Sequence, residues 1–292
     1  MKVLSMGSCN IDYIYEVDHI VRPGETQTVG KMRIVSGGKG LNQSIALAKA
    51  GVDVYYAGLV GADGGILREA LVSNHVNCDY LVQVEEKSGH AIIQLDRAGE
   101  NCILVYPGAN HCFTRAYVDE VLANFERGDV LILQNEINLM DYIMTQAHQL
   151  GIQIVLNPAP FNEMIHQLDL SLVDYLILNE VEGQDLTGKQ DDFEVLSHLK
   201  ETYPQTHLIL TRGAKGALYA KGDLIIEQSS FKVEAVDTTA AGDTFIGYLI
   251  YGIVSGQEIA TSLELAAKAS SITVTRKGSS SSIPTLDEVL SK

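Results

Sequence analysis

The stretch VDTTAAGDTF, residues 236–245, places two aspartates six positions apart, and the second follows Ala240, Ala241 and Gly242. Apolar residues recur at helical spacing after Asp243, so we expect a buried helix that begins at this small-residue turn. The first N–H groups of a helix and the positive end of its dipole suit a phosphate. A carboxylate beside that phosphate could take a proton from an attacking hydroxyl group. Ordinary helix capping by the same residues is the simpler interpretation.

Three other segments combine glycine or polar residues in spacings that suit a site. GGKG at 37–40 precedes a helix, and it is either a flexible turn with a solvated lysine or a backbone that approaches a ligand next to the Lys39 cation. TRGAKGA at 211–217 is typical of a turn between two strands. Asn179 and Glu182, three positions apart, share one helix face, as capping residues do. Each simple interpretation can stand alone, but all of them would have to hold at once.

The sequence lacks the two common nucleotide-binding motifs. A Walker loop needs Gly-Lys followed by Ser or Thr, whereas GGKGLN has Gly40 after Lys39. A dinucleotide fingerprint needs GxGxxG after the first strand, whereas GSCNID contains Gly7 alone. The sequence therefore disfavours both P-loop and dinucleotide-binding folds.

Short β-rich runs alternate with helical patterns along most of the chain. The expected buried strands are residues 3–6, 54–57, 130–133, 152–156, 175–178 and 208–210. The expected helices are residues 41–50, 66–74, 116–124, 140–150 and 193–202. This alternation predicts the α/β class: a three-layer α/β/α sandwich around a mainly parallel sheet.

Two stretches, 13–35 and 90–106, break this alternation. They carry RPGET and DRAGEN in their middles, which is typical of hairpin-like strands. We expect them to form one small β lid that covers an active site, within a single domain of residues 1–292.

Polar residues follow the predicted strands where ligands bind in open α/β sheets, beyond the carboxyl ends of the strands. These residues are Asn10, Asp12, Glu136, Asn157, Asn179, Glu182 and Thr211. Carboxylates and amides along one rim favour a polar small-molecule site.

Composition limits the partners and the compartment. The 292 residues include 37 Asp and Glu against 21 Lys and Arg, a formal net charge of −16, so we expect no nucleic-acid partner and no membrane partner. No apolar run approaches about 20 residues, and MKVLSMGSCNID lacks the apolar core of a signal peptide. The four cysteines show no metal-binding spacing, so we expect free thiols in a cytoplasmic protein.

In order, and over essentially the whole length, these motifs resemble the ribokinase-like family of PfkB-type carbohydrate kinases. The matching segments are GSCNIDYIYEVDHIVRPGET, SGGKGLNQSIALAKAG, PGAN, NPAP, NEVEGQDLTG, LTRGAKGALY, VDTTAAGDTF and VTRKGSSSSIP. The GGKG-N segment and DTxxAGD are jointly very specific. The resemblance implies transfer of the ATP γ-phosphoryl group to a sugar hydroxymethyl group, and a homodimer formed through the β lid.

The resemblance also implies roles for individual residues. Asp243 would be the base that deprotonates the sugar hydroxyl, and the anion hole would consist of the N–H groups of Ala240, Ala241, Gly242 and Asp243. The implied sugar-binding residues are Asn10, Asp12, Gly38, Lys39, Asn42, Glu136 and Asp243. The implied ATP and Mg²⁺ region comprises Asn179, Glu182, Thr211, Gly213, Gly216 and Gly242. An implied K⁺ site, mostly of backbone carbonyls, comprises Asp237, Thr239, Thr273, Arg276, Gly278 and Ser282.

The leading hypothesis is an ATP-dependent kinase that converts D-ribose to D-ribose 5-phosphate, because the implied sugar-binding set is complete. A kinase for deoxyribose, fructose or pseudouridine is the alternative, since the lid strand carries the polar residues His90 and Gln94. A non-catalytic sugar-binding regulator would be expected to lose the base or the anion-hole glycine, yet Asp243 and Gly242 are both present. A dinucleotide oxidoreductase is disfavoured because the fingerprint is missing.

Overall fold

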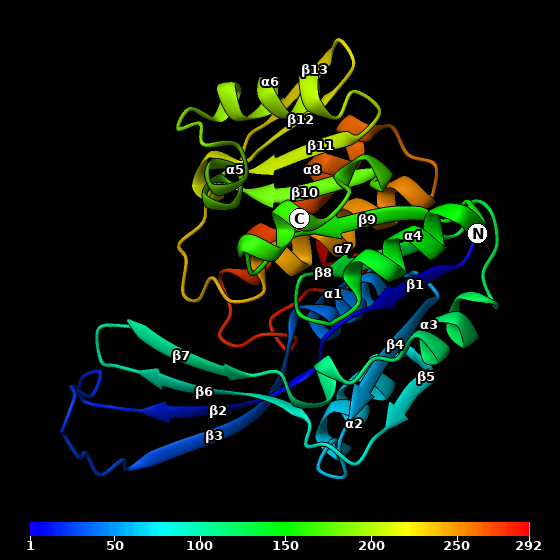
Figure 1. The fold of residues 1–292 in the computed structure, drawn as a ribbon. Helices are drawn as coiled ribbons and strands as arrows, with labels where there is room; N and C mark the ends of the chain where they lie inside the picture. The colour runs from blue at the N-terminus through cyan, green and yellow to red at the C-terminus, as the bar shows by residue number, and fades with distance from the viewer. Residues whose placement is uncertain (292) are drawn as a thin grey trace.

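A large sheet with helices on both faces lies beside a small, separate sheet (Figure 1). The computed structural model describes residues 1–291. Within them the large sheet has nine strands, in the spatial order β13-β12-β11-β10-β9-β8-β1-β4-β5, and all neighbours from β11 to β5 run parallel. The prediction of an α/β fold with a mainly parallel sheet is confirmed.

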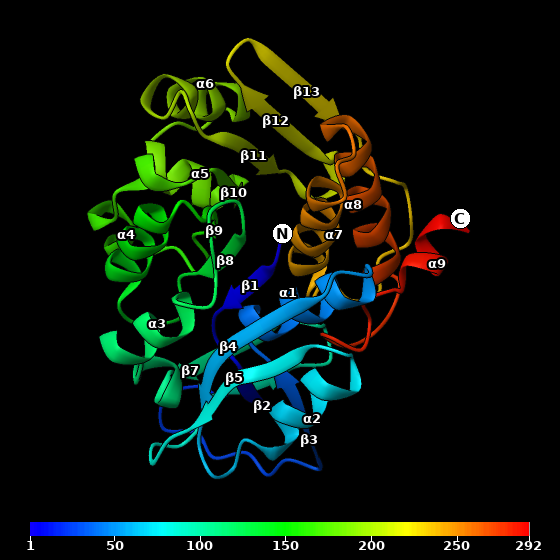
Figure 2. The same cartoon turned by 90° about the vertical axis from the view of Figure 1, so that its right-hand side faces the viewer.

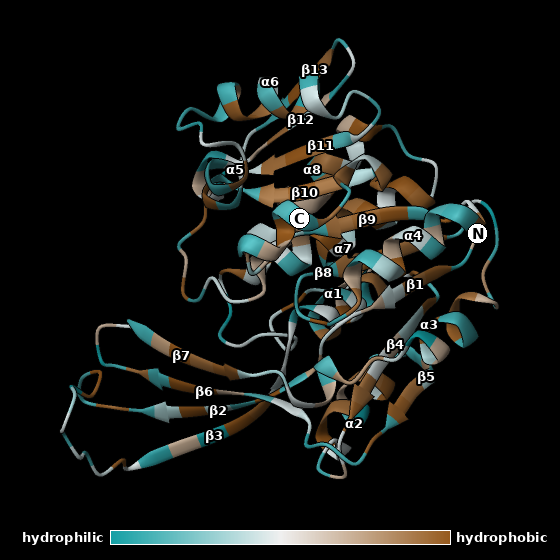
Figure 3. Cartoon of the chain, in the orientation of Figure 1, coloured by the Kyte–Doolittle hydropathy of each residue, from teal (hydrophilic) through white to brown (hydrophobic). Residues whose placement is uncertain are grey.

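Every strand predicted for the sandwich lies in the large sheet. The predicted strands are β1 (Val3–Met6), β4 (Val54–Val60), β8 (Val130–Gln134), β9 (Gln153–Asn157), β10 (Tyr175–Asn179) and β11 (His207–Thr211). The sheet also contains β5 (Asn77–Gln83), β12 (Ala217–Lys221) and β13 (Leu224–Gln228), which were not predicted. The central strands are apolar runs because helices cover both faces of a parallel sheet (Figure 3). The last two strands, β12 and β13, are antiparallel and form one edge.

Helices from different parts of the chain form the two outer layers (Figure 2). One layer comprises α3 (Arg115–Leu122), α4 (Met140–Leu150), α5 (Glu180–Thr187) and α6 (Asp192–Thr202). The other comprises α1 (Lys39–Lys49), α2 (Gly65–Ser73), α7 (Ala241–Val254) and α8 (Ile259–Thr273), with α9 (Leu286–Leu290) against α8. Short 3₁₀ turns are η1 (Gly108–His111), η2 (Glu163–Gln167), η3 (Leu170–Leu172) and η4 (Gly213–Lys215). No helix in residues 1–291 is long and apolar enough to cross a membrane.

The two irregular stretches of the sequence pair with each other in the small sheet. Its strands are β2 (Asn10–Glu16), β3 (Lys31–Gly37), β6 (Gly89–Leu95) and β7 (Asn101–Tyr106), in the order β3-β2-β6-β7. Asn10 pairs with both Gly37 and Gly89, so the base of the small sheet continues directly into the turn before α1. The small sheet therefore begins at Asn10, a few residues after the end of β1.

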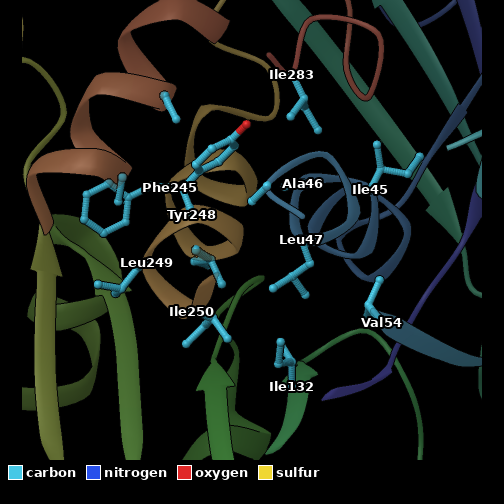
Figure 4. Packing of buried hydrophobic residues seen from close by; sticks show 14 of the residues in the cluster. Ile45, Ala46, Leu47, Val54, Ile132, Phe245, Tyr248, Leu249, Ile250 and Ile283 are labelled. Carbon is cyan, nitrogen blue, oxygen red and sulfur yellow. The ribbon is translucent and has the colours of Figure 1, made fainter. Parts of the chain in front are cut away.

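Helices α1 and α7 pack tightly against each other in the core (Figure 4). Phe245, Tyr248 and Leu249 of α7 are buried, as the helical spacing after Asp243 predicts. A Cβ atom added at Gly247 would lie 2.4 Å from the Cβ atom of Ala46, so the two helices approach at closer range than ordinary side chains allow. This approach brings the beginnings of both helices to the same place.

Candidate active site

The carboxyl ends of neighbouring parallel strands bring the predicted rim residues side by side. Asn157 at the end of β9 pairs in register with Gln134 at the end of β8, a residue that the sequence did not single out. Asn179 at the end of β10 pairs with Thr211 at the end of β11. The beginnings of α1 and α7 lie at the same edge, because Asn42 and Gln43 contact Asp243 there. The geometric expectation of one polar rim agrees with the structure.

Asp243 lies at the centre of this rim, in the first turn of α7, with only 8% of its surface exposed. Asn42 donates its Nδ2 to the Oδ2 atom of Asp243 at 3.1 Å. Gln43 donates its Nε2 to the Oδ1 atom of Asp243 at 3.0 Å. Hydrogen bonds from amide donors stabilise the ionised form of a carboxylate and fix its plane.

The turn before Asp243 has the geometry of an anion site. Ala240 adopts a left-handed conformation with φ of 60°, and its carbonyl accepts the Thr244 N–H at 2.8 Å. The Ala241 N–H donates to the carbonyl of Thr238 at 3.2 Å. In the first turn of α7, the N–H groups of Gly242 and Asp243 donate to no carbonyl group among residues 1–291. Apart from its chain neighbours and the backbone of α7, a Cβ atom on Gly242 would have no heavy atom of residues 1–291 within 4 Å, so this side of the turn is open to a ligand.

The beginning of α1 is capped by a carboxylate from another part of the chain. Glu136 accepts the Lys39 N–H at 3.0 Å and the hydroxyl of Ser8, which places a negative charge at the helix N-terminus. A Cβ atom on Gly38 or Gly40 would lie within 2.9 Å of backbone atoms of residues 7–10. Glycine is therefore required at both positions because α1 begins in contact with the turn after β1. This reason differs from the closeness to a ligand that the sequence predicted.

Lys39 carries the positive charge of this region. Burial alone would lower the pKa of its ammonium group, but the carboxylates of Asp243, Glu136 and Glu182 outweigh that effect and the pKa is raised. The ammonium group therefore remains charged beside Asp243. A cation near a helix N-terminus is suited to an anionic ligand.

Asn10 and Asp12 of β2 line the base of the small sheet. Asn110 donates its Nδ2 to Oδ1 of Asn10 at 2.7 Å, which leaves the Asn10 amide nitrogen as the donor of that side chain. Burial raises the pKa of Asp12 to about 7, and the Glu136 carboxylate adds to this shift. The two groups offer a donor and a titratable carboxyl group at one end of the rim.

Asn179 and Glu182 form a complete capping box at the beginning of α5. The Asn179 side chain accepts the Glu182 N–H at 2.9 Å, and Glu182 accepts the Asn179 N–H at 3.0 Å. Burial raises the pKa of Glu182, although the Asn179 N–H and the Lys39 charge oppose the shift. The simpler sequence interpretation, helix capping, thus describes the observed contacts, while Glu182 also faces the Lys39 charge.

The TRGAKGA segment forms the turn between β11 and β12. Gly213 and Gly216 have φ values of 51° and 99°, in the region that favours glycine. Lys215 forms an ion pair with Glu180 at 2.7 Å, which holds this turn against the beginning of α5. Thr211, Gly213 and Gly216 therefore lie next to the Asn179–Glu182 cap.

A match along almost the whole chain decides the family. Residues 1–286 match the family described as pfkB family carbohydrate kinase. The chain belongs to this family. The resemblance drawn from the motifs is confirmed, and the protein is a PfkB-type carbohydrate kinase.

This kinase is similar to ribokinases over its full length. The ribokinase of Schizosaccharomyces pombe is 37% identical over 310 residues, which cover 99% of this chain and 96% of that protein. The ribokinase of Cryptococcus neoformans var. grubii, solved in complex with ADP, is 33% identical with a TM-score of 0.87, and the match covers 99% of both chains. The Arabidopsis thaliana ribokinase, complexed with ribose and ATP, is 28% identical with a TM-score of 0.89, covering 99% of this chain and 97% of that one.

The region implied as a K⁺ site in this kinase lies between the turn at 237–239 and the loop after α8. Asp237 accepts the Thr239 N–H at 2.9 Å and the Gly278 N–H at 3.0 Å. Burial alone would raise the pKa of Asp237, but these bonds lower it. Within residues 1–291, no group of three or more His, Cys, Asp or Glu side chains is placed so that it could hold a metal ion.

Three other residues implied for the K⁺ site turn their side chains elsewhere. The hydroxyl of Thr273 donates to Thr244 at 3.0 Å, Arg276 forms an ion pair with Glu288 at 2.7 Å, and Ser282 donates to the carbonyl of Ser279 at 2.7 Å. Of these residues only the backbone carbonyls could serve an ion. The structure thus brings Asp237, Thr239 and Gly278 together. The side chains of Thr273, Arg276 and Ser282 make their contacts with other residues.

Sequence reasoning missed several buried polar residues of the kinase. Ser8, Gln43 and Asn110 each bond to a predicted site residue, and Gln134 bonds to Gln43, yet none of the four was assigned a role. Gln134 ends the apolar run VLILQ, and a polar residue at the end of a buried strand was the available signal.

Proposed function

We propose that this kinase transfers the γ-phosphoryl group of ATP to the hydroxymethyl group of D-ribose, giving D-ribose 5-phosphate and ADP. The observation that carries the proposal is the Asp243 carboxylate, held by Asn42 and Gln43 directly beside the open N-terminal turn of α7. The full-length similarity to ribokinases, including one complexed with ribose and ATP, supports both substrates.

Asp243 acts as the general base in this proposal. Its carboxylate takes the proton of the sugar hydroxyl while the sugar oxygen forms a bond to the γ-phosphorus. The bond from that phosphorus to the bridging oxygen breaks, ADP leaves, and the proton remains on Asp243 until it is released to solvent. The charged Lys39 ammonium group interacts with this carboxylate, which supports a role for Lys39 in the electrostatics of the site.

The N-terminal turn of α7 stabilises the transferring phosphoryl group in this proposal. The Gly242 and Asp243 N–H groups are the donors, and the Ala240 and Ala241 backbone shapes the turn. Ser270 of α8 donates its hydroxyl to the Ala241 carbonyl at 3.0 Å, which braces the turn from behind. Donors fixed before the reaction stabilise developing charge without a cost of reorganisation.

The sugar pocket is formed by polar groups whose free atoms suit a polyol. Among residues 1–291, the Oδ1 atom of Asn42 is buried and accepts no hydrogen bond. A buried acceptor without a donor costs about 1–3 kcal/mol, and a sugar hydroxyl would satisfy it. The other proposed contacts come from Asn10, Asp12, Gly38, Lys39 and Glu136. A sugar that lacks a matching hydroxyl leaves such groups unpaired, which gives the pocket its selectivity.

Two ions complete the proposal. Mg²⁺ prefers oxygen ligands and retains water, and Asn179 and Glu182 would hold it near the ATP phosphates, where it neutralises charge. Thr211, Gly213 and Gly216 would contact the nucleotide from the neighbouring turn. K⁺ would bind between Asp237 and the loop that contains Gly278, using mostly carbonyl oxygens, and would order the turn before Ala240.

The small sheet acts as the lid and joins two copies into a homodimer in this proposal. Its base carries Asn10 and Asp12, so a movement of the sheet would change the sugar pocket directly. Its exposed apolar residues, described in the Discussion, support contact with a second copy.

The test is ADP release by the purified protein with ATP, Mg²⁺ and K⁺, comparing D-ribose with 2-deoxyribose, fructose and pseudouridine. We expect ribose to be the preferred acceptor and Asp243→Asn to serve as an inactive control. Preference for another acceptor would leave the mechanism standing and overturn the assignment to ribose. Absence of turnover with every acceptor would favour a sugar-binding regulator.

A further inference from the structure

Gln43 is fully buried beside Asp243 and connects it to the large sheet. Its Nε2 donates to Oδ1 of Asp243 at 3.0 Å and to Oδ1 of Asn157 at 3.3 Å. Its Oε1 accepts from Nε2 of Gln134 at 2.7 Å. Because Gln43 and Gln134 are 0% exposed, water cannot replace these bonds if one of them is lost.

The orientation of the Gln43 amide is set from both ends. Asn157 donates its Nδ2 to the Ile177 carbonyl at 3.0 Å, so its Oδ1 faces Gln43 and requires a donor. Gln134 donates its Nε2 to the Oε1 atom of Gln43, while its own Oε1 is buried without a partner among residues 1–291. The Asn157 acceptor and this Gln134 donor together turn the Nε2 of Gln43 toward Asp243. A reversed amide would place its Oε1 against the carboxylate and leave buried groups unpaired.

We infer that Gln43 is a positioning residue for phosphoryl transfer: it holds the Asp243 carboxylate in the plane in which the sugar proton is accepted, and Gln134 holds Gln43. This inference rests on the proposed role of Asp243 as base. Gln43 itself touches neither phosphate nor sugar in this scheme, because its two amide atoms are occupied by Asp243, Asn157 and Gln134. Its effect passes through a charge-assisted hydrogen bond, which is stronger than a neutral one.

The deciding variant is Gln43→Glu, which keeps the size of the side chain and can still accept from Gln134. Two carboxyl groups at hydrogen-bond distance hold one proton between them to higher pH. We therefore expect kcat at pH 6 to fall roughly tenfold or more relative to the wild-type protein, and to recover toward pH 9. Ribose binding, measured by calorimetry at pH 9, should change little. A purely structural defect would lower activity without this recovery at high pH.

A second variant, Gln134→Met, tests the same inference without adding charge. It removes the donor that orients Gln43 and contacts neither Asp243 nor the sugar residues. We expect kcat to fall several-fold with the KM for ribose unchanged. Asn157→Ala removes the other bond that orients Gln43, so we expect its kcat to fall as well, again with the KM for ribose unchanged.

The outcomes distinguish a failure of the positioning role from a failure of the proposed function. An acid-limb shift in Gln43→Glu, or, should that variant not fold, a loss of kcat alone in Gln134→Met, supports the positioning role. If the wild-type protein is active but Gln43→Glu has the same pH profile, or Gln134→Met has the same kcat, the positioning role is overturned while the proposed function stands. A wild-type protein without kinase activity overturns the proposed function and this inference with it.

Discussion

Gly247 of α7 lies so close to Ala46 of α1 that an added Cβ atom would be 2.4 Å from the Ala46 Cβ atom. One helical turn earlier, on the same faces, lie Asp243 and Asn42. The distance between the helices at Gly247 therefore determines whether Asn42 and Gln43 can reach the Asp243 carboxylate. The core contact and the proposed base belong to the same pair of helices.

Gly247→Ala should separate α1 from α7 and affect both stability and catalysis. Overpacking a core by a methyl group costs about 1–3 kcal/mol, and the displaced helices should lengthen the bonds to Asp243 and lower kcat. Gly65→Ala in α2 is the matched control, because its added Cβ would have no neighbour within 4 Å among residues 1–291. Thermal unfolding and turnover of both variants check this. Equal stability of the two variants would contradict it.

Asp243→Asn should abolish turnover while sugar binding remains nearly normal. The amide keeps the size of the side chain but cannot accept the proton in the transition state, so kcat should fall by about 10²–10⁴-fold. Calorimetric ribose binding and ADP release measure the two effects separately. Unchanged turnover would remove Asp243 from the mechanism.

The sandwich could be predicted because its signals are local. Buried parallel strands are short apolar runs, and the apolar residues of helices recur with a period of 3.6 residues. Each element can therefore be recognised from a short stretch of sequence. The rim could be predicted as well, since the carboxyl ends of parallel strands meet at one edge regardless of the loops between them.

The hydrogen bonds that organise the rim could not be predicted. Gln43 bonds to Gln134, 91 positions away, and to Asp243, 200 positions away. Nothing in the local pattern distinguishes Gln43 from a solvated helix residue. The tight contact at Gly247 was also hidden, because a glycine within an apolar helix indicates a close neighbour without naming it.

Asp12 should make the stability of the kinase fall with rising pH. Its pKa is raised from 3.8 to about 7, mainly by burial and then by Glu136, so the folded protein holds a proton that the unfolded chain releases from about pH 4 upward. The free energy of unfolding therefore decreases by up to about 4 kcal/mol as pH rises from about 4 to 7, at about 1.4 kcal/mol per pKa unit. Above about pH 7 this contribution no longer changes.

Asp12→Asn isolates this contribution, because the amide carries no titrating proton. The gain in unfolding free energy of the variant over the wild-type protein should be larger at pH 8 than at pH 5, measured by urea unfolding at both values. A gain that is the same at both pH values would show that Asp12 does not titrate in this window.

Replacement of K⁺ by Na⁺ should lower the rate if Asp237 belongs to an ion site. Asp237 links the turn at 237–239 to Gly278, and α7 begins directly after this turn, so an ion held there would order the Gly242 N–H group. Asp237→Ala should remove the difference between the two ions. Steady-state rates with each chloride salt check this, and equal rates in wild-type protein would argue against K⁺ specificity.

One face of the small sheet carries a row of side chains across its four strands, three of which are apolar and exposed. Ile34, Tyr13, Ile92 and Leu104 are opposite one another in register; Ile34, Ile92 and Leu104 are exposed, Leu104 by 65%, whereas Tyr13 is half-buried against the core. Side chains alternate along a strand, so Asp12 projects from the other face, which leaves this row available to another molecule. An exposed apolar face on a sheet with an open edge strand favours association.

Leu104→Glu should therefore convert a dimer of the kinase into monomers. A dimer through this row would bury Leu104 of both copies, and an unpaired carboxylate in such a contact is strongly unfavourable because it loses its hydration. Light scattering after size-exclusion chromatography measures the mass. Val72→Glu on α2 is the matched control, since Val72 is 55% exposed and lies outside the small sheet. A monomeric wild-type protein, or dimers of both variants, would show that this face does not join two copies.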